Sequence, residues 1–313
     1  MTVVVLGSVN HDVVCEVSRL PGPGETILAA ETRTNLGGKG SNQAVAAAKA
    51  GGQVEFVARV GEDPDPSLRK SLCEYGVGLE AVVEVPGART GTAYISVAAG
   101  ENQIVVDPAA NFRWESDAEL DSSVAAELIA AAEVVVAQLE VPVRVVRWTA
   151  RHARRFILNA APASSLPAEL LRRCDPLIVN ESELAGLTGE VATTPRQAFD
   201  QARALCLDGV PAVVATLGAA GAVWVRRDGP STVAGGHQPA PRIHSTDSTG
   251  AGDAFVGALA TALAEGGDLP SGVAFATAAA ALAVQAAGTH TAYPTRDRIT
   301  AALSAVPPAR EFA

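Results

Sequence analysis

The sequence predicts an α/β protein: a mostly parallel central sheet between two layers of helices, with a second, smaller β-sheet. Three observations support this fold class. Short apolar runs alternate along the chain with stretches of helical spacing, and polar residues follow these runs. Two further segments have an extended pattern with little helical character. The chain has 313 residues, of which 48% are hydrophobic and 19% charged, so it can bury a sizeable core.

The predicted central strands are continuous apolar runs rather than alternating ones. Such runs are typical of parallel strands, because helices cover both faces of a parallel sheet. Ligands of these sheets bind beyond the carboxyl ends of the strands, and five polar strand ends indicate a site at that edge. The predicted strands are residues 3–6, 134–137, 156–158, 177–179 and 212–215, and the predicted helical stretches are 44–50, 117–132, 143–154, 195–208 and 278–287.

The two extended segments, residues 12–34 and 89–106, interrupt the alternation of strands and helices. They contain Thr, Val, Ile and Tyr, and the first includes a Pro-Gly-Pro-Gly turn at 21–24. A sheet of a few strands cannot bury both of its faces, so this one has to cover the main domain or a partner. We therefore expect a large domain made of residues 1–11, 35–88 and 107–313, with 12–34 and 89–106 as a covering sheet.

The charge balance disfavours a nucleic-acid binder. Lys and Arg number 24 against 34 Asp and Glu, a net charge of −10, whereas phosphate backbones require a basic surface. No apolar run approaches the roughly 20 residues that cross a bilayer, and the first residues lack the pattern of a secretory signal. The four cysteines form no C-x-x-C pair, and the five histidines have no zinc-binding spacing. We expect a cytoplasmic protein with reduced cysteines.

The segment Asp247-Ser-Thr-Gly-Ala-Gly-Asp253 carries the strongest chemical signal and leads into a helical pattern. Its glycines allow close backbone approach, and free N–H groups at a helix start bind phosphate. Asp253 would lie in the first turn, where the helix dipole should keep it a weak base for an attacking hydroxyl. The alternative is an ordinary turn with Asp as the cap. The segment is neither a Walker A loop nor a complete G-x-G-x-x-G motif, because Phe255 occupies the third glycine position.

Two further segments fit a polyol site. Residues 36–43 (LGGKGSNQ) place three glycines, Lys39 and Asn42 at a helix start; the alternative is a flexible loop with a surface lysine. Asn10 and Asp12 follow the first strand and project to one side of an extended chain, an arrangement that suits vicinal hydroxyls. An Asn/Asp turn is the alternative for this pair. The residues alone therefore predict a nucleotide or phosphate enzyme with a polyol site, and they do not name the sugar.

Together these motifs resemble the ribokinase (PfkB) family of carbohydrate and nucleoside kinases. The matching segments are S-V-N-H-D at 8–12, G-G-K-G-S-N-Q-A at 37–44, N-E-S-E at 180–183 and D-S-T-G-A-G-D-A-F at 247–255. They occur in the family's order between residue 4 and about 294. The resemblance implies a three-layer α/β/α ribokinase-like domain with a small β-sheet lid. It also implies transfer of the ATP γ-phosphate to a sugar hydroxyl, with the 5-hydroxyl of D-ribose as the first candidate.

The resemblance also assigns roles to individual residues. Asp253 would be the catalytic base, and the amides of Gly250, Ala251 and Gly252 would form the anion hole. The residues implied for the sugar are Asn10, Asp12, Gly38, Lys39, Gly40, Asn42, Glu140 and Asp253, with Ala93 and Ile95 as apolar cover. The residues implied for the nucleotide and its Mg²⁺ are Asn180, Glu183, Thr216, Gly218, Gly221, Gly252 and Thr277. A K⁺ ion would be bound by Asp247 and by the carbonyls of Thr249, Ala283, Ala286 and Gly288.

Three positions depart from the family pattern. Ala292 stands where a hydroxyl often reaches the monovalent cation, Ala110-Asn111 replaces a usual Gly-Asn, and Thr277 stands where histidine or asparagine is frequent. The resemblance further implies a homodimer formed through the lid. Small apolar lid residues favour a small neutral sugar. An acid substrate would need Arg33 or Arg89 in the lid pocket, and a nucleoside would need stacking aromatics there.

Two alternatives to a D-ribose kinase remain open at this point, and a third is disfavoured. One is another kinase of the family, acting on fructose, a keto-deoxy sugar acid or a nucleoside. A second is a non-catalytic sugar- or nucleotide-binding module, although such a module would not require the base. A Rossmann oxidoreductase is disfavoured, because the first strand ends in Gly7-Ser-Val-Asn10 without the glycine fingerprint for pyrophosphate.

Overall fold

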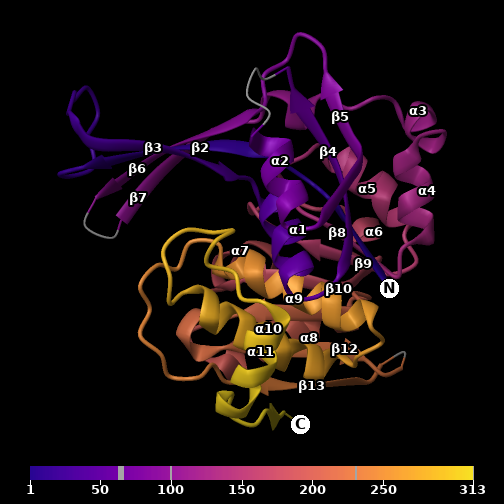
Figure 1. Cartoon of the computed structure of the whole chain (residues 1–313). Coiled ribbons are helices and arrows are strands. Elements are labelled where there is room, and N and C mark those ends of the chain that lie inside the picture. Colours follow the sequence, from indigo (N-terminus) through magenta and orange to yellow (C-terminus); the bar gives the residue numbers. More distant parts are fainter. Residues whose placement is uncertain (63–66, 99–100, 230, 313) are drawn as a thin grey trace.

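The computed structural model describes residues 1–62, 67–98, 101–229 and 231–312. Within them, ten strands form one large sheet (Figure 1). Neighbouring strands are parallel from β5 to β11, and β12, β13 and β14 add antiparallel strands at one edge. In spatial order the strands are β14 (Arg310–Glu311), β13 (Val233–Gln238), β12 (Ala222–Arg227), β11 (Ala212–Thr216), β10 (Cys174–Asn180), β9 (Phe156–Asn159), β8 (Val134–Ala137), β1 (Thr2–Leu6), β4 (Gln53–Gly61) and β5 (Val77–Val85).

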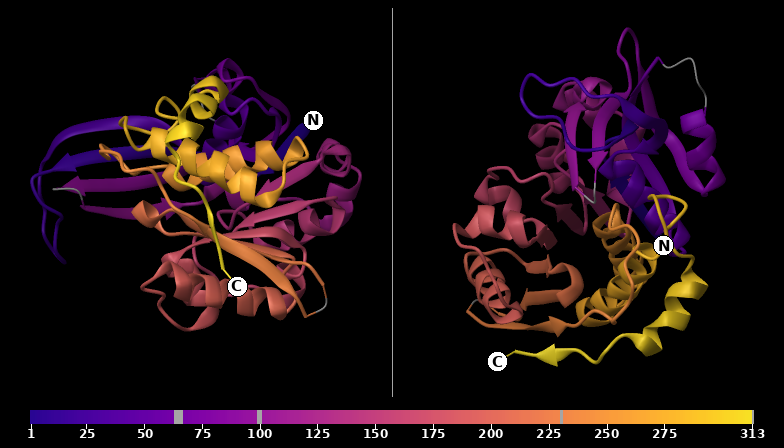
Figure 2. Two further views of the ribbon diagram at one scale, coloured as in Figure 1. Left: turned by 90° about the horizontal axis from the view of Figure 1, so that it is seen from below. Right: turned by 90° about the vertical axis from the view of Figure 1, so that its left-hand side faces the viewer.

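Helices cover both faces of this sheet, as the continuous apolar strands predict (Figure 2). In β1, for example, Val3 and Val5 face one core and Val4 and Leu6 face the other, all fully buried. The helices on the first face are α1 (Lys39–Lys49), α2 (Ser67–Glu74), α9 (Ala251–Ala264), α10 (Leu269–Ala283) and α11 (Arg296–Ala302). Those on the second are α3 (Asp117–Asp121), α4 (Val124–Ala131), α5 (Val143–His152), α6 (Ala168–Leu171), α7 (Glu181–Thr188) and α8 (Pro195–Leu207). The three-layer α/β/α fold is thereby confirmed.

The smaller sheet extends away from the large one, at the left of Figure 1. Its strand order is β3 (Ala29–Gly37), β2 (Asn10–Val17), β6 (Gly91–Ala98) and β7 (Glu101–Asp107), with β2 and β6 parallel. The sheet is longer than the segments anticipated from the sequence, because Asn10 already pairs with Gly37 and with Gly91. Both strands β2 and β3 therefore run directly into the loops that carry the candidate site residues.

The alternation along β6 sets its inner and outer faces. Ala93 lies opposite Asp12 and Ile95 opposite Val14, so these four share one face of the sheet. Tyr94 is on the other face and is 47% exposed. The sequence prediction that Tyr94 points away if Ala93 and Ile95 face the ligand agrees with this arrangement.

Two predicted helices differ from the structure. The helical stretch 117–132 is broken into α3 and α4, because the hydroxyls of Ser122 and Ser123 donate to the carbonyls of Glu119 and Leu120 and end the first helix. The alanine-rich window 278–287 is helical only to Ala283. The predicted set also lacks strands β4, β5, β12, β13 and β14 of the large sheet.

Helices α1 and α9 approach each other closely beneath the site. A Cβ atom placed on Gly257 would lie 2.6 Å from the Ala47 nitrogen and 2.7 Å from the Gln43 carbonyl oxygen. The Thr261 hydroxyl, one turn further, donates to the Ala47 carbonyl at 3.1 Å. This contact fixes the two helix starts, and the side chains that they carry, relative to each other. None of the helices in the described ranges is long and apolar enough to cross a membrane.

Candidate active site

A cavity of about 1220 Å³ lies between the inner face of the small sheet and the segments around α9 and α10. Asp12, Ile95 and Arg33 line it from the small sheet, and Asp247 and Gly288 line it from the opposite side. Four polar residues at or just after the carboxyl ends of β1, β8, β9 and β10 are buried: Ser8, Gln138, Asn159 and Glu183. The structure therefore places the candidate site at the carboxyl ends of the parallel strands, as the sequence predicts.

Asp253 is in the first turn of α9 and is 8% exposed. Both carboxylate oxygens accept hydrogen bonds from side-chain amides of α1: Asn42 Nδ2 donates to Oδ2 at 3.0 Å, and Gln43 Nε2 donates to Oδ1 at 2.9 Å. Burial raises the pKa of Asp253, although Lys39 and the two amides act in the opposite direction. The helix dipole was expected to keep this carboxylate a weak base. Burial acts in the direction opposite to this dipole effect and favours proton uptake by Asp253.

Gln43 belongs to a buried chain of amides that the sequence motifs did not single out. Its Nε2 also contacts Asn159 Oδ1 at 2.9 Å, and its Oε1 accepts from Gln138 Nε2 at 2.7 Å. Asn159 and Gln138 lie at the ends of β9 and β8, and all three amides are buried. The position of the Asp253 carboxylate is therefore tied to the edge of the sheet.

Lys39, Glu140 and Ser8 form a second cluster beside Asp253. Glu140 Oε2 accepts from Ser8 Oγ at 2.6 Å and from the Lys39 amide at 3.0 Å. Burial acts to lower the pKa of Lys39, but the carboxylates of Asp253, Glu140 and Glu183 together raise it. The Lys39 ammonium thus stays charged among three carboxylates that lie between 101 and 214 positions away from it in the sequence.

Glycines make room for this cluster. Gly38 has a φ of 93°, and a Cβ atom on it would lie 2.9 Å from the Asn10 nitrogen. A Cβ on Gly37 would lie 2.0 Å from Asp12 Oδ2, and one on Gly40 would lie 2.5 Å from the Ser8 nitrogen. The glycine-lysine segment therefore packs directly against the start of β2, rather than forming a flexible loop.

Asn10 is buried and is positioned by Asn111. Asn111 Nδ2 donates to Asn10 Oδ1 at 2.8 Å and to the Val9 carbonyl at 3.0 Å, and Asn111 Oδ1 accepts from the Val9 amide at 2.9 Å. The sequence marked Ala110-Asn111 only as a departure from the family pattern. In the structure, Asn111 orients one of the residues implied for the sugar.

Asp12 gives the site a measurable pH dependence. Burial raises its pKa to about 7, and the nearby carboxylates of Glu140 and Asp253 add to this shift. Between about pH 4 and pH 7 the folded state holds a proton that the unfolded state has released, so the free energy of unfolding falls as the pH rises. We expect Asp12→Asn to remove this loss of stability and to be more stable than the wild type at pH 8, by about 4 kcal/mol.

Urea unfolding of both proteins at pH 5 and pH 8 measures this effect. The stability difference between variant and wild type should grow with pH across the window. A difference that is the same at both pH values would mean that Asp12 has an ordinary pKa.

The segment predicted as an anion hole begins α9. Gly250 is the N-cap and has a φ of 71°, in the left-handed region, and the Ala251 amide donates to the Ser248 carbonyl at 3.2 Å. A Cβ atom on Gly252 would meet no other atom within 4 Å, so the backbone there faces open space. An anion can reach the first turn of α9 beside Asp253.

The residues implied for the nucleotide follow β10 and β11 or lie on α10. Asn180 and Glu183 form a capping box at the start of α7, with 2.8 Å bonds in both directions. Burial raises the pKa of Glu183, against the Asn180 amide and Lys39. Thr216 ends β11, Gly218 begins the short turn after it, and Gly221 ends that turn with a φ of 96°. Thr277 is buried on α10, and its hydroxyl has no hydrogen-bond partner among the described residues.

The residues implied for K⁺ lie on two adjoining segments. The amides of Thr246 and Asp247 donate to the Val284 carbonyl at 2.7 and 3.2 Å, and Asp247 Oδ2 accepts from the Gly288 amide at 2.9 Å. This brings Asp247 and Thr249 next to the chain that contains Ala283, Ala286 and Gly288. Ala292 is 4% exposed and offers no hydroxyl. In the part of the chain that the structure describes, no three His, Cys, Asp or Glu side chains gather as a metal site.

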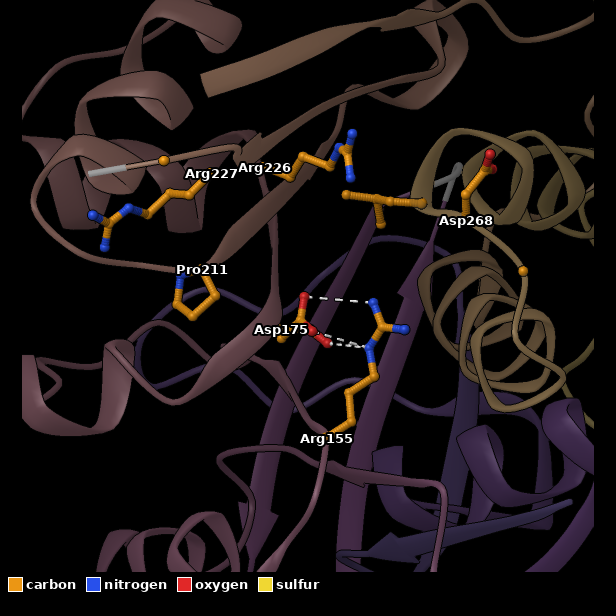
Figure 3. A pocket seen from close by; sticks show the side chains of 9 residues that line it. Arg155, Asp175, Pro211, Arg226, Arg227 and Asp268 are labelled. Carbon is orange, nitrogen blue, oxygen red and sulfur yellow. Dashed lines mark hydrogen bonds and ion pairs between the residues drawn. The ribbon is translucent and has the colours of Figure 1, made fainter. Parts of the chain in front are cut away.

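A second cavity, of about 700 Å³, lies at the opposite ends of the strands from the candidate site, near the amino ends of β10 and β11 (Figure 3). Arg155 and Asp175 face each other in its wall, with Nε and Oδ2 3.2 Å apart. Arg226, also in the wall, is paired with Asp228 at 3.2 Å. The residues described above as the candidate site are remote from this cavity.

The fold and the site together define a phosphoryl-transfer enzyme: a buried carboxylate and an open helix start meet beside a polar cluster at the carboxyl edge of the sheet. The chain belongs to the pfkB family of carbohydrate kinases, whose profile matches residues 1–296. It is therefore an ATP-dependent sugar kinase.

Relatives of the chain include two kinds of pentose kinase. A deoxyribokinase of Salmonella typhi is 34% identical over 312 residues, which cover 97% of this chain and 99% of that protein. A ribokinase of Haemophilus influenzae is 35% identical over 301 residues, covering 94% and 96%. Among solved structures, the Thermotoga maritima ribokinase has a TM-score of 0.86 and 31% identity, covering 97% and 99%. Arabidopsis thaliana ribokinase complexed with ribose and ATP has a TM-score of 0.84 and 33% identity, covering 96% and 98%.

Proposed function

We propose that this kinase phosphorylates the 5-hydroxyl of D-ribose, giving D-ribose 5-phosphate and ADP. The observation that carries the proposal is the position of Asp253, buried in the first turn of α9 and held by two amides beside Lys39 and Glu140. The full-length similarity to ribokinases, one of them in complex with ribose and ATP, supports D-ribose as the acceptor.

In this proposal each part of the site has one task. Asp253 takes the proton of the attacking hydroxyl, and its raised pKa suits that role. The backbone of Gly250, Ala251 and Gly252 binds the transferred phosphoryl group at the helix start. The residues proposed to contact the sugar are Asn10, Asp12, Gly38, Lys39, Gly40, Asn42 and Glu140, with Ala93 and Ile95 as apolar cover.

The nucleotide and the cations are proposed to bind on the other side of Asp253. Asn180, Glu183, Thr216, Gly218, Gly221 and Thr277 are the proposed nucleotide contacts. Mg²⁺ would neutralise phosphate charge when bound. Since no three acidic, His or Cys side chains among the described residues are placed to hold a metal ion, it would be bound largely by phosphate and water oxygens near Glu183. Asp247 and neighbouring carbonyls suit K⁺, although Ala292 removes one expected oxygen ligand.

Among the alternative acceptors, an acidic sugar is disfavoured by the charge of the cavity. Arg33 lines the cavity, but its guanidinium is paired with Glu16, and Arg89 is paired with Asp107 at 3.0 Å and largely exposed. The second candidate is 2-deoxy-D-ribose, because deoxyribokinases are among the relatives that match the full length of the chain.

An assay of ADP release tests the acceptor. The panel is D-ribose, 2-deoxy-D-ribose, D-fructose, a keto-deoxy sugar acid and a nucleoside, each with and without K⁺. We expect the highest kcat/KM with D-ribose. A higher value for 2-deoxy-D-ribose would make the chain a deoxyribokinase, and ADP release that is independent of any acceptor would contradict the whole proposal.

We further propose a cytoplasmic homodimer formed through the small sheet. Val105 on the outer face of this sheet is 70% exposed, and an open sheet with an exposed apolar face readily pairs with a second copy. The four cysteines are unpaired, in keeping with a reducing compartment. Light scattering should give twice the monomer mass, and a monomer at micromolar concentration would exclude the dimer.

A further inference from the structure

Tyr293 is a buried residue next to the candidate site for which the sequence motifs suggest no role. Its side chain is 2% exposed, and its hydroxyl has no hydrogen-bond partner among the residues that the structure describes. Buried polar groups are nearly always hydrogen-bonded, so an unpaired hydroxyl requires an explanation. Phenylalanine would fill the same space without leaving a donor unpaired. The hydroxyl is therefore expected to have a partner that is absent when no ligand is bound.

The surrounding backbone holds this side chain firmly in place. The amides of Ala292 and Tyr293 both donate to the Thr289 carbonyl, at 2.9 and 3.2 Å, and form a single turn after Gly288. The ring of His290 lies beside the Tyr293 ring, with centroids 6.1 Å apart. Tyr293 reaches the site from a segment that is distant in sequence from every proposed catalytic residue.

The hydroxyl of Tyr293 lies against the start of α9. A Cβ atom placed on Gly250 would be 2.6 Å from the Tyr293 oxygen, so only a glycine fits at the N-cap. Burial raises the pKa of Tyr293 well above its usual value, and the carboxylates of Asp253 and Asp12 raise it further. The phenol therefore remains neutral and keeps its proton. It also lies within electrostatic reach of both the proposed base and a proposed sugar contact.

We propose that the Tyr293 hydroxyl is a side-chain member of the anion hole and donates a hydrogen bond to the phosphoryl group during its transfer. This inference rests on the proposed function, which places the γ-phosphate at Gly250–Gly252. In the reaction, the bond between phosphorus and the ADP oxygen breaks and the bond to the sugar oxygen forms. The proton of the attacking sugar hydroxyl passes to Asp253, and the Tyr293 hydroxyl keeps its own proton throughout.

The physical advantage of such a donor is preorganisation. The transferred phosphoryl group carries negative charge on three equatorial oxygens, and fixed donors stabilise that charge without reorganising. Since the Tyr293 hydroxyl has no protein partner, no existing hydrogen bond must break before it meets the phosphoryl group. Its oxygen is covered in this conformation, so the turn before α9 has to shift slightly for the contact to form. The donor is also excluded from water, which strengthens the interaction.

The test compares Tyr293→Phe with Tyr94→Phe, a control on the outer face of the small sheet. Both are assayed for kcat and KM with the panel sugar that the wild type turns over fastest. We expect Tyr293→Phe to lower kcat about 100-fold, the typical effect of losing one anion-hole donor, with both KM values within threefold of the wild type. Tyr94→Phe should match the wild type. The thermal midpoint of Tyr293→Phe should be unchanged or higher, because an unpaired buried hydroxyl is removed.

A binding measurement gives a readout that is independent of turnover. Aluminium fluoride with ADP, Mg²⁺ and the same sugar mimics the transferring phosphoryl group. We expect Tyr293→Phe to bind this mixture about 100-fold more weakly, while ADP alone binds as in the wild type.

A kcat within twofold of the wild type would overturn the proposal, as would an effect confined to the sugar KM or to the K⁺ concentration required. A wild type that phosphorylates another sugar in preference to D-ribose would refute the proposed acceptor. It would leave the comparison of the two tyrosine variants valid, because that comparison uses the preferred sugar.

Discussion

Asp253→Asn is expected to lower kcat by about three orders of magnitude, while leaving ADP and sugar binding within a few-fold of the wild type. The loss of a general base typically reduces the rate by about 10²–10⁴-fold. Asparagine has nearly the same shape as aspartate and can still accept a hydrogen bond from Asn42 or Gln43. The variant therefore removes the proton acceptor but keeps the packing at the start of α9.

The control for this prediction is Asp297→Asn. Asp297 is an exposed aspartate in the first turn of another helix, α11, so it matches Asp253 in residue type and local position but lies outside the site. Its kcat should equal that of the wild type. If Asp253→Asn retained more than a tenth of the wild-type kcat, the carboxylate would not be the base.

Gly40→Ala is expected to raise the sugar KM at least tenfold and to destabilise the fold by about 1–3 kcal/mol. A Cβ atom at residue 40 would lie 2.5 Å from the Ser8 nitrogen and 2.6 Å from the Ser8 carbonyl oxygen, both backbone atoms that cannot move aside easily. The start of α1 must shift, and with it the Lys39 amide that donates to Glu140. The proposed sugar contacts then lose their mutual alignment.

Gly186→Ala is the matched control, since this glycine is also helical but has open space where a Cβ would lie. Alanine favours a helix over glycine by about 1 kcal/mol, so Gly186→Ala should be neutral or stabilising, with unchanged kinetics. Steady-state kinetics give the sugar KM of both variants, and urea unfolding gives their free energies of unfolding. Equal behaviour of the two variants would show that the close approach at residue 40 is unimportant.

Five of the ten strands of the large sheet, β1 and β8 to β11, were predictable because they are continuous apolar runs. The strand predicted at 134–137 has the same bounds as β8. Strands β4 and β5 were missed: β4 contains the charged Glu55 and Arg59, and the sequence does not reveal that Arg59 is buried against Glu115 and the ring of Trp114. Local pattern thus fails where a tertiary contact makes a charged residue compatible with burial.

The candidate site was predictable in its glycine-rich segments and not in its supporting contacts. Glycine patterns at helix starts are local and visible in sequence. The hydrogen bond from Asn42 to Asp253 joins residues 211 positions apart, and the bond from Asn111 to Asn10 spans 101 positions. The same limit applies to the pKa of Asp253, because the dipole of its own helix is a local property and its burial depends on the whole fold.

The junction between the two sheets has a consequence for selectivity. Asn10 and Asp12 are part of β2, and β3 ends at Gly37, two residues before Lys39. If the small sheet tilts, the groups proposed to bind the sugar move with it, so we expect acceptor affinity to depend on the orientation of that sheet. An alcohol that fits poorly would bind weakly and would also leave the small sheet away from its bound orientation. Discrimination between acceptors should therefore appear in kcat as well as in KM.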